Sequence, residues 1–225
     1  MPVEESTPAK LRDEEIRGIY TRLLPLYGIW ERLVETRARE SALELAAVRD
    51  NEKVLEVGVG PGTALERLAG SNPGGTTIGV DICFDMLQRA NQRVSSALQA
   101  PPPLCQCDTR SLPFADHSFD LVFSSYMLDL LSASDIATAI QQMRRVLKPS
   151  GRLLLLHLSL GNRWFDRFWG LFYWLVPTLL GGCRPIRLAA YLPEAGFAVR
   201  EVRQITQRGV PTEVILASNP GLPQG

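Results

Sequence analysis

The segment Lys53-Val-Leu-Glu-Val-Gly-Val-Gly-Pro-Gly62 decides the fold. It begins as a short apolar run and ends in three glycines at alternate positions, Gly58, Gly60 and Gly62. A buried strand that passes through glycines into a helix brings backbone N–H groups close to a ligand, because glycine has no Cβ to keep the ligand away. The segment therefore predicts the first strand of an α/β sheet, with a ligand bound at its carboxyl end.

Strands and helices alternate beyond this loop, which is typical of a parallel sheet covered by helices on both faces. The expected strands are residues 53–59, 76–81, 104–107, 119–125 and 152–159, and the helices between them are expected to end near residues 69, 100 and 147. Two more strand-like runs, 197–205 and 212–217, are joined by a segment that contains Gly209 and Pro211. They predict an antiparallel hairpin at the sheet edge.

Two amphipathic stretches precede the first strand. Residues 11–27 and 30–48 place apolar side chains at helical spacing, and Pro25 is expected to end or kink the first helix. We therefore expect a helical cap over residues 1–49 and a ligand-binding domain over residues 50–225. The side chains expected to face inward from the second helix are Trp30, Leu33, Val34, Ala38, Leu45 and Ala46.

The composition excludes some partners. The chain has 225 residues, of which 45% are hydrophobic, and its 24 Lys plus Arg balance 24 Asp plus Glu. A nucleic-acid-binding protein needs a basic surplus, and no Asn/Asp-Pro-Pro-Tyr/Phe segment follows the fourth strand, so we expect no nucleic-acid partner. Cys105 and Cys107 are too close together for a zinc knuckle, so we expect reduced thiols and no metal. Residues 1–10 lack the apolar core of a signal peptide, which makes the cytoplasm the expected location.

The glycine spacing favours one class of ligand. A dinucleotide fold has G-x-G-x-x-G, with a helix N-terminus facing a pyrophosphate, whereas this chain has Gly58-x-Gly60-x-Gly62. S-adenosylmethionine (SAM) has no phosphate, and its methionine end carries a carboxylate that backbone N–H groups can receive. Glu56 can order the loop, or its carboxylate can bind the ammonium of the same methionine end, directly or through water.

Further residues suit an adenosine cofactor. Asp81 ends the second strand, where a carboxylate can accept both ribose hydroxyls, as in NAD proteins. Met86 lies one turn into the next helix, where it can pack on the adenine. Asp108 follows the third strand and can accept a hydrogen bond from the adenine amino group. The block at 107–125, Cys-Asp-Thr-Arg-Ser-Leu-Pro-Phe-Ala-Asp-His-Ser-Phe-Asp-Leu-Val-Phe-Ser-Ser, is not expected in an NAD domain, so SAM is the expected cofactor.

The chain resembles the class I SAM-dependent methyltransferases, in particular the ubiquinone/menaquinone-biosynthesis methyltransferase-like group. Four segments carry the resemblance, at residues 54–62, 79–87, 112–122 and 145–153, within the half of the chain from about residue 50 to about residue 160. Cys83-Phe84 stands where the group usually has Ser-Pro.

The resemblance implies an α/β, Rossmann-like class I methyltransferase fold. Its sheet has seven strands, mostly parallel with an antiparallel last strand, in agreement with the expected C-terminal hairpin. The cofactor-binding residues expected on this basis are Glu56, Gly58, Gly60, Gly62, Asp81, Ile82, Met86, Asp108, Thr109 and Ser124.

Catalytic candidates are expected after the fourth and fifth strands, because ligands of such sheets sit at the carboxyl ends of the strands. His157 ends an apolar strand and is interpreted as a general base or as a satisfied buried histidine. Tyr20 and Tyr27 of the cap either line the site beside a sulfonium or pack in the core. The further acceptor-side candidates are Ser124, Ser125, Tyr126, Asp129 and Ser159.

A lipophilic segment follows the fifth strand. Residues 168–183 hold no charge, but sixteen residues with one proline and three glycines are short for a bilayer span, which needs about 20 residues. We expect a lipophilic lid insertion at about 162–185. It is either a helix packed on the core or, through about 164–183, an element that contacts a membrane surface or admits a greasy acceptor.

The leading hypothesis is an enzyme that methylates a hydrophobic small molecule, such as a quinone precursor or a lipid-like acceptor, by direct methyl transfer. Two alternatives stay open. One is a phosphatidylethanolamine-type phospholipid N-methyltransferase at the membrane surface, and the other is a SAM-binding protein without catalysis.

Overall fold

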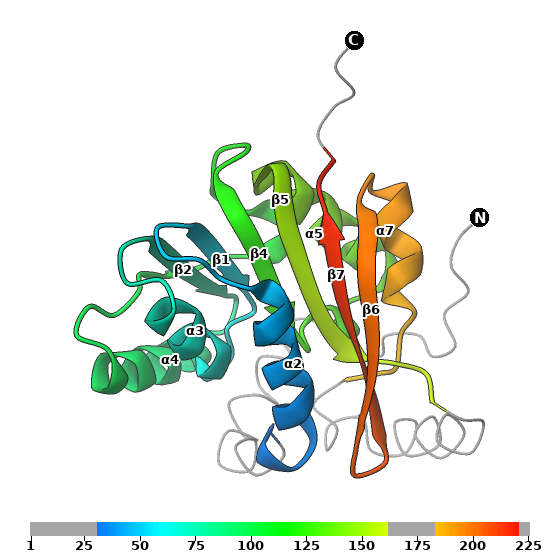
Figure 1. Cartoon of the computed structure of the whole chain (residues 1–225), viewed down its shortest axis with the longest axis horizontal. Coiled ribbons are helices and arrows are strands. Elements are labelled where there is room, and N and C mark those ends of the chain that lie inside the picture. The colour runs from blue at the N-terminus through cyan, green and yellow to red at the C-terminus, as the bar shows by residue number, and fades with distance from the viewer. Residues whose placement is uncertain (1–30, 162–182, 221–225) are drawn as a thin grey trace.

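One seven-stranded sheet forms the centre of the molecule. The structure is a computed structural model that describes residues 31–161 and 183–220. The strands follow the order β3-β2-β1-β4-β5-β7-β6, with helices on both faces (Figure 1). The first five strands pair in parallel, and β7 runs antiparallel between β5 and β6. The predicted seven-stranded sheet with its antiparallel C-terminal hairpin is confirmed.

The bounds of the elements lie close to those expected from the sequence. The strands are β1 (Lys53–Val57), β2 (Thr76–Asp81), β3 (Leu104–Gln106), β4 (Phe119–Ser125), β5 (Leu147–Leu158), β6 (Ala198–Gln207) and β7 (Val210–Ser218). The α-helices are α2 (Thr36–Ala46), α3 (Thr63–Gly70), α4 (Phe84–Ala97), α5 (Ala133–Val146) and α7 (Tyr191–Glu194). Shorter helical turns are the π-turn η1 (Glu31–Glu35) and the 3-10 turns η2 (Thr109–Ser111), η3 (Leu128–Leu130) and η4 (Leu188–Ala190).

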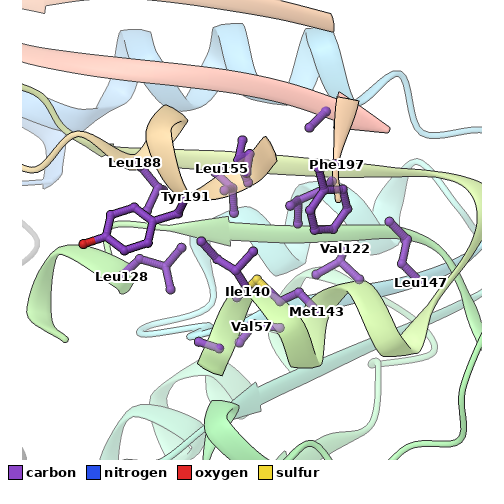
Figure 2. Close-up of a cluster of buried hydrophobic side chains, with 14 of the residues drawn as sticks. Val57, Val122, Leu128, Ile140, Met143, Leu147, Leu155, Leu188, Tyr191 and Phe197 are labelled. Atoms are coloured by element: carbon purple, nitrogen blue, oxygen red, sulfur yellow. The ribbon is translucent and has the colours of Figure 1, made fainter. Parts of the chain in front are cut away.

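The alternating side chains of β5 separate two cores. Leu153 and Leu155 pack in a cluster on the face of the sheet that α5 covers, part of which Figure 2 shows. Leu154 and Leu156 point to the opposite face and pack against α2. Because both faces are covered, the entirely apolar run at residues 153–156 is stable there.

The N-terminal helix packs on this second face through small side chains. Ala38, Ala42 and Ala46 are completely buried against the sheet. The expected inward position of Leu33 is wrong, since its side chain is 36% exposed, and Arg39 is buried instead. The π-turn η1 precedes α2 and changes the number of residues per turn, so an ideal 3.6-residue period does not assign the buried face correctly. Residues 1–30 of the expected cap lie outside the described residues.

Strand β5 starts earlier than the sequence indicates. Pro149 and Gly151 predict a turn, but Leu147 already pairs with Phe119 of β4. A register shift follows between Phe119 and Leu121, and regular pairing resumes at Arg152. The irregular start brings β4 and β5 side by side up to their carboxyl ends, where the pocket lies.

Candidate functional site

A pocket opens at the carboxyl ends of β1, β2 and β4, the edge at which parallel α/β sheets bind ligands. Its walls come from the strand ends, from η2 and from the turn that follows β4. The residues that line it are Val57, Gly58, Val80, Asp81, Ile82, Cys107, Asp108, Thr109, Arg110, Met127, Leu130 and Leu131. Five of the predicted cofactor residues therefore share one pocket: Gly58, Asp81, Ile82, Asp108 and Thr109.

The glycine loop takes a backbone conformation that L side chains rarely adopt. The φ angles are +76° at Gly58, +51° at Gly60 and +83° at Gly62. A Cβ on Gly58 would lie 2.6 Å from Cγ of Met127, whereas a Cβ on Gly60 would meet no atom within 4 Å. Gly58 is therefore required by packing, and Gly60 leaves open space beside the loop.

Asp81 ties the loop to the end of β2. Its Oδ2 accepts a hydrogen bond from the N–H of Gly60 at 2.9 Å, and its Oδ1 accepts one from the N–H of Cys83 at 2.8 Å. Burial raises the pKa of this carboxyl, and the backbone N–H groups oppose that rise. Each oxygen keeps a lone pair for a further donor.

Asp108 and Arg110 form the wall on the opposite side of the pocket. Asp108 accepts from the N–H of Arg110 at 2.8 Å and so caps η2. The guanidinium Nη2 of Arg110 donates to Oδ2 of Asp108 at 2.6 Å. Arg110 was not expected at the site. The sequence offered one indication of its position, since Arg110 lies two residues after Asp108, within the turn that Asp108 caps.

The other five expected cofactor residues do not line the pocket: Glu56, Gly60 and Gly62 of the glycine-loop segment, and Met86 and Ser124. Met86 is buried beside Cys83, on the inner side of α4. Ser124 is buried and donates from Oγ to the carbonyl of Val57 at 2.9 Å, which links β4 to β1.

Glu56 lies in a buried group of charges at the base of the loop. Its side chain is 1% exposed, and its Oε2 has no hydrogen-bond partner among the described residues. Burial raises the pKa of Glu56 well above the usual range, and the nearby guanidinium of Arg39 opposes that rise. Arg39 pairs with Glu31 at 2.9 Å and with Glu35 at 2.6 Å. The apolar periodicity of the N-terminal helix gave no indication of these three residues.

The chain turns sharply after β4. Tyr126 has φ of +51°, a strained value for a large side chain, and is held by its N–H on the carbonyl of Leu156 and by its hydroxyl on Thr212 at 3.0 Å. This turn directs Met127 over Gly58 and leads into η3. The pocket's apolar wall thus depends on the backbone geometry of Tyr126.

Two candidates from the sequence, Asp129 and His157, lie close together in the core below that turn. Asp129 is completely buried and accepts from the N–H of Leu158 at 3.2 Å. Burial raises the pKa of Asp129 to about 6, while that N–H and the charges of His157 and Arg184 oppose the rise. Arg184, also buried, donates from its backbone N–H to the carbonyl of Asp129 at 3.3 Å and from Nη2 to that of Leu131.

Both ring nitrogens of His157 are engaged. Nδ1 lies 3.0 Å from the carbonyl of Leu158, and Nε2 lies 3.2 Å from Oε2 of Glu213, its neighbour on β7. Glu213 accepts a further hydrogen bond, on Oε1, from Nε2 of Gln204. Both partners of the ring, the carbonyl of Leu158 and the carboxylate of Glu213, are hydrogen-bond acceptors. Glu213 and Gln204 were missed because only the register of the hairpin on β5 places Glu213 beside His157 and Gln204 beside Glu213.

Some expectations lie beyond the described residues. Tyr20 and Tyr27 fall outside them, as does nearly all of the insertion at 162–185. No helix in the two described ranges is both long and apolar enough to cross a bilayer. Within the same ranges, no three His, Cys, Asp or Glu side chains gather in a way that could hold a metal ion.

Comparison with known proteins relates this chain to methyltransferases. A family described as methyltransferase domain matches residues 55–155. A 2-phytyl-1,4-naphtoquinone methyltransferase of Trichormus variabilis is 32% identical over 158 residues, which cover 66% of each protein. The ubiquinone/menaquinone biosynthesis C-methyltransferase UbiE of Geobacter sulfurreducens is 28% identical over 180 residues, which cover 76% of this chain and 69% of that protein. The match thus spans about two thirds of each of these two relatives.

Solved structures share the fold. The N-methyltransferase NodS of Bradyrhizobium japonicum, in complex with S-adenosyl-L-homocysteine, superposes with a TM-score of 0.65. It covers 83% of this chain and 88% of its own, at 20% identity.

The geometry of the pocket fits SAM. Glu56 brings a buried carboxylate oxygen that has no hydrogen-bond partner among the described residues, and open space lies beside Gly60. Asp81, at the end of β2, faces the same pocket as the apolar wall. On the strength of this site, the sheet order and the likeness in sequence, the chain belongs to the class I SAM-dependent methyltransferases.

Proposed function

We propose that this methyltransferase transfers a methyl group from SAM to a hydrophobic, quinone-related small molecule. The observation that carries the proposal is the likeness to two proteins named for quinone methylation, at 32% and 28% identity. The apolar side chains of Met127, Leu130 and Leu131 in the pocket wall suit such an acceptor. Direct transfer needs the acceptor atom aligned with the methyl–sulfur bond in a pocket from which water is excluded.

We assign the cofactor to residues that line the pocket and to the glycine-loop segment from Glu56 to Gly62. Asp81 would accept the ribose hydroxyls through the remaining lone pairs of its carboxylate, and Asp108 with Thr109 would contact the adenine. Glu56 would receive the ammonium of the methionine end, and the backbone beside Gly60 its carboxylate. Gly58 and Gly62 support the loop through its backbone turn. The positions of Met86 and Ser124 favour roles in packing and in sheet pairing instead.

SAM supplies the electrophilic methyl group. A hydroquinone acceptor must also lose a proton, and we propose that the His157–Glu213 pair serves this step. His157 holds the carboxylate of Glu213 through Nε2, and Glu213 keeps 13% exposure while the ring is completely buried. Glu213 is therefore the member of the pair that can meet an acceptor, and His157 is a positioning residue. Tyr20 and Tyr27 remain proposed site-lining residues on the basis of the sequence.

Replacing members of this pair tests their role. His157→Ala and Glu213→Gln are expected to lower kcat at least tenfold and leave the Kd for SAM unchanged. The pH profile of kcat should lose its acidic limb in Glu213→Gln. An equal loss of SAM affinity and of turnover would show that the pair only supports the fold.

Acceptor screening tests the function itself. Purified protein and methyl-labelled SAM are mixed separately with a prenylated naphthoquinol, with phosphatidylethanolamine vesicles and with a bacterial lipid extract, and products are identified by mass spectrometry. Label on the quinol ring is the expected result. Label on the phospholipid amine would instead identify a phospholipid N-methyltransferase, and tight SAM binding without any transfer would identify a SAM-binding protein without catalysis. Vesicle flotation of the full chain tests the membrane contact that the sequence of 164–183 predicts.

A further inference from the structure

A buried charge cluster lies between the N-terminal helix and the first strand. It consists of Glu31, Glu35 and Arg39 from η1 and α2, and Glu56 from β1, and every member is less than 8% exposed. Arg39 contacts Glu31 and Glu35 directly. Among the described residues, one guanidinium faces the three carboxyl groups of this cluster, and it cannot neutralise all three as carboxylates.

Glu56 points into this cluster and not toward α5. Its strand neighbours Leu55 and Val57 pack in the core on the α5 side, whereas Val54 packs with α2. Alternation along a strand places Glu56 on the face of Val54, next to Arg39. Its Oε2 is buried without a hydrogen-bond donor among the described residues. A buried acceptor without a donor is unfavourable, and the same oxygen becomes favourable once a cation lies beside it.

Groups outside the cluster also face it, from β2, from η3 and from the residue that follows β4. The charges of Arg39, of Glu31 and of Asp81 in β2 act on the carboxyl group of Glu56. The charges of Arg39, of Glu31 and of Asp129 in η3 act on the carboxyl group of Glu35. The phenol of Tyr126, at the end of β4, faces Glu35 and Arg39. Most of these neighbours are acidic, so a cationic ligand bound beside Glu56 would favour the ionised forms of the carboxyls.

We infer that Glu31, Glu35 and Arg39 of the N-terminal helix complete a buried counter-charge for the cofactor, reached through Glu56, and that cofactor binding expels a proton from this cluster. Burial keeps protons on the cluster in the free protein, as the raised pKa of Glu56 and that of Glu35, about 7, indicate. The ammonium and the sulfonium of SAM bring positive charge that favours the ionised carboxylates. The inference concerns the cofactor alone, so its outcome does not depend on the proposed acceptor.

Proton release gives a direct signature. By linkage, a ligand whose binding releases one proton binds roughly tenfold more tightly for each unit of rising pH over the window of release. S-adenosyl-L-homocysteine keeps the ammonium and lacks the sulfonium charge, so it is expected to release fewer protons than SAM. The cluster would thereby favour the methyl donor over the product of its reaction.

Calorimetry on the full chain measures this release. SAM is titrated at pH 7 in buffers of different ionisation enthalpy, and the slope of the observed enthalpy against that quantity gives the number of protons released. About one proton is expected for the unmodified chain. Glu56→Gln should abolish the release. Glu35→Gln should reduce it, because glutamine still accepts from Arg39 but no longer competes as an anion for its charge, so that Glu56 is ionised to a greater extent before SAM binds.

Controls separate this inference from a general effect of charge. Glu40→Gln alters an exposed carboxyl of the same helix and should release as many protons as the unmodified chain. If Glu56→Gln does not fold, Glu35→Gln still decides, since a release unchanged from that of the unmodified chain overturns the inference. Release that persists in both variants would assign the proton to Asp81 and would likewise overturn it, as would a slope of zero for the unmodified chain.

Discussion

Gly58 directly follows the last residue of β1, and both its backbone conformation and its packing exclude a side chain. Its φ is +76°, and an added Cβ would lie within 2.7 Å of both Cβ and Cγ of Met127. These atoms are the base of a side chain whose backbone is fixed by the strained turn at Tyr126, so Met127 cannot withdraw by a simple rotation. At Gly60, by contrast, an added Cβ would project into open space.

The two glycines should therefore respond differently to alanine. Gly58→Ala is expected to lower the free energy of unfolding by about 2 kcal/mol or more through strain and overlap. Gly60→Ala should cost less stability but weaken SAM binding, because its methyl group projects into the space assigned to the ligand. Urea denaturation and SAM titration of both variants check this. Equal stability loss in the two variants would contradict the packing argument.

Glu35 makes the stability of the fold depend on pH. Burial raises its pKa to about 7, above the ordinary carboxyl value in the unfolded chain. The protonated form is therefore favoured by folding. The contribution of this protonated carboxyl to the free energy of unfolding is fully present below pH 4 and is lost as the pH rises through about 7.

Glu35→Gln should remove this dependence. Between pH 5 and pH 8 the unmodified chain should lose more unfolding free energy than the variant does. The difference should be on the order of 3 kcal/mol if the whole pKa shift of Glu35 contributes. Thermal or urea unfolding at the two pH values checks the difference, with Glu40→Gln as the matched exposed control. A difference of the opposite sign would show that Glu35 is ionised and held by Arg39 throughout this range.

At the scale of elements, helix α5 offers a clean test of local sequence signals. Ser132 caps it, with Oγ accepting from the N–H of Asp135 at 3.2 Å and donating to the carboxylate of the same residue at 2.8 Å. Ser132→Ala should lower the free energy of unfolding by about 1 kcal/mol, whereas Ser132→Thr should retain most of the stability that the cap contributes. Asp135 also pairs with Arg110 of the pocket wall at 3.4 Å, and both substitutions leave these two side chains in place, so SAM affinity should stay unchanged in both variants. A large loss of affinity in Ser132→Ala would show that the cap also fixes the η3 wall.

Elements were predictable from the sequence where periodicity and glycines act locally. The strand Phe119–Ser125 and the second strand, Thr76–Asp81, have the expected bounds. The sequence could not reveal that Arg39 is buried, because only the third dimension places a guanidinium between carboxyls of two elements. In the same way, Glu213 becomes a partner of His157 only through the register of β7 on β5. The cofactor side of the site, built from residues next to strand ends, was therefore easier to predict than the acceptor side.

For the whole molecule, ligand binding should appear as added stability. A ligand that binds only the folded state at a concentration of 100 times its Kd adds roughly 2.7 kcal/mol, which for a chain of this size raises Tm by roughly 5 to 10 °C. SAM is expected to give such a shift and NAD none. Differential scanning fluorimetry measures both, and Asp81→Asn should reduce the SAM shift. A shift with NAD equal to that with SAM would contradict the assignment of the loop.

The insertion of β7 between β5 and β6 has a consequence for synthesis of the chain. β5 is completed at Leu158, but the strand that covers its free edge starts only at Val210. During translation, the run Leu153-Leu-Leu-Leu156 therefore waits with unpaired backbone groups along one side for some fifty residues. An unprotected apolar edge of this kind is a template for pairing between nascent chains. Yield on expression should thus be governed by chaperone supply and translation speed, and aggregates formed in the cell should be built around residues 153–156.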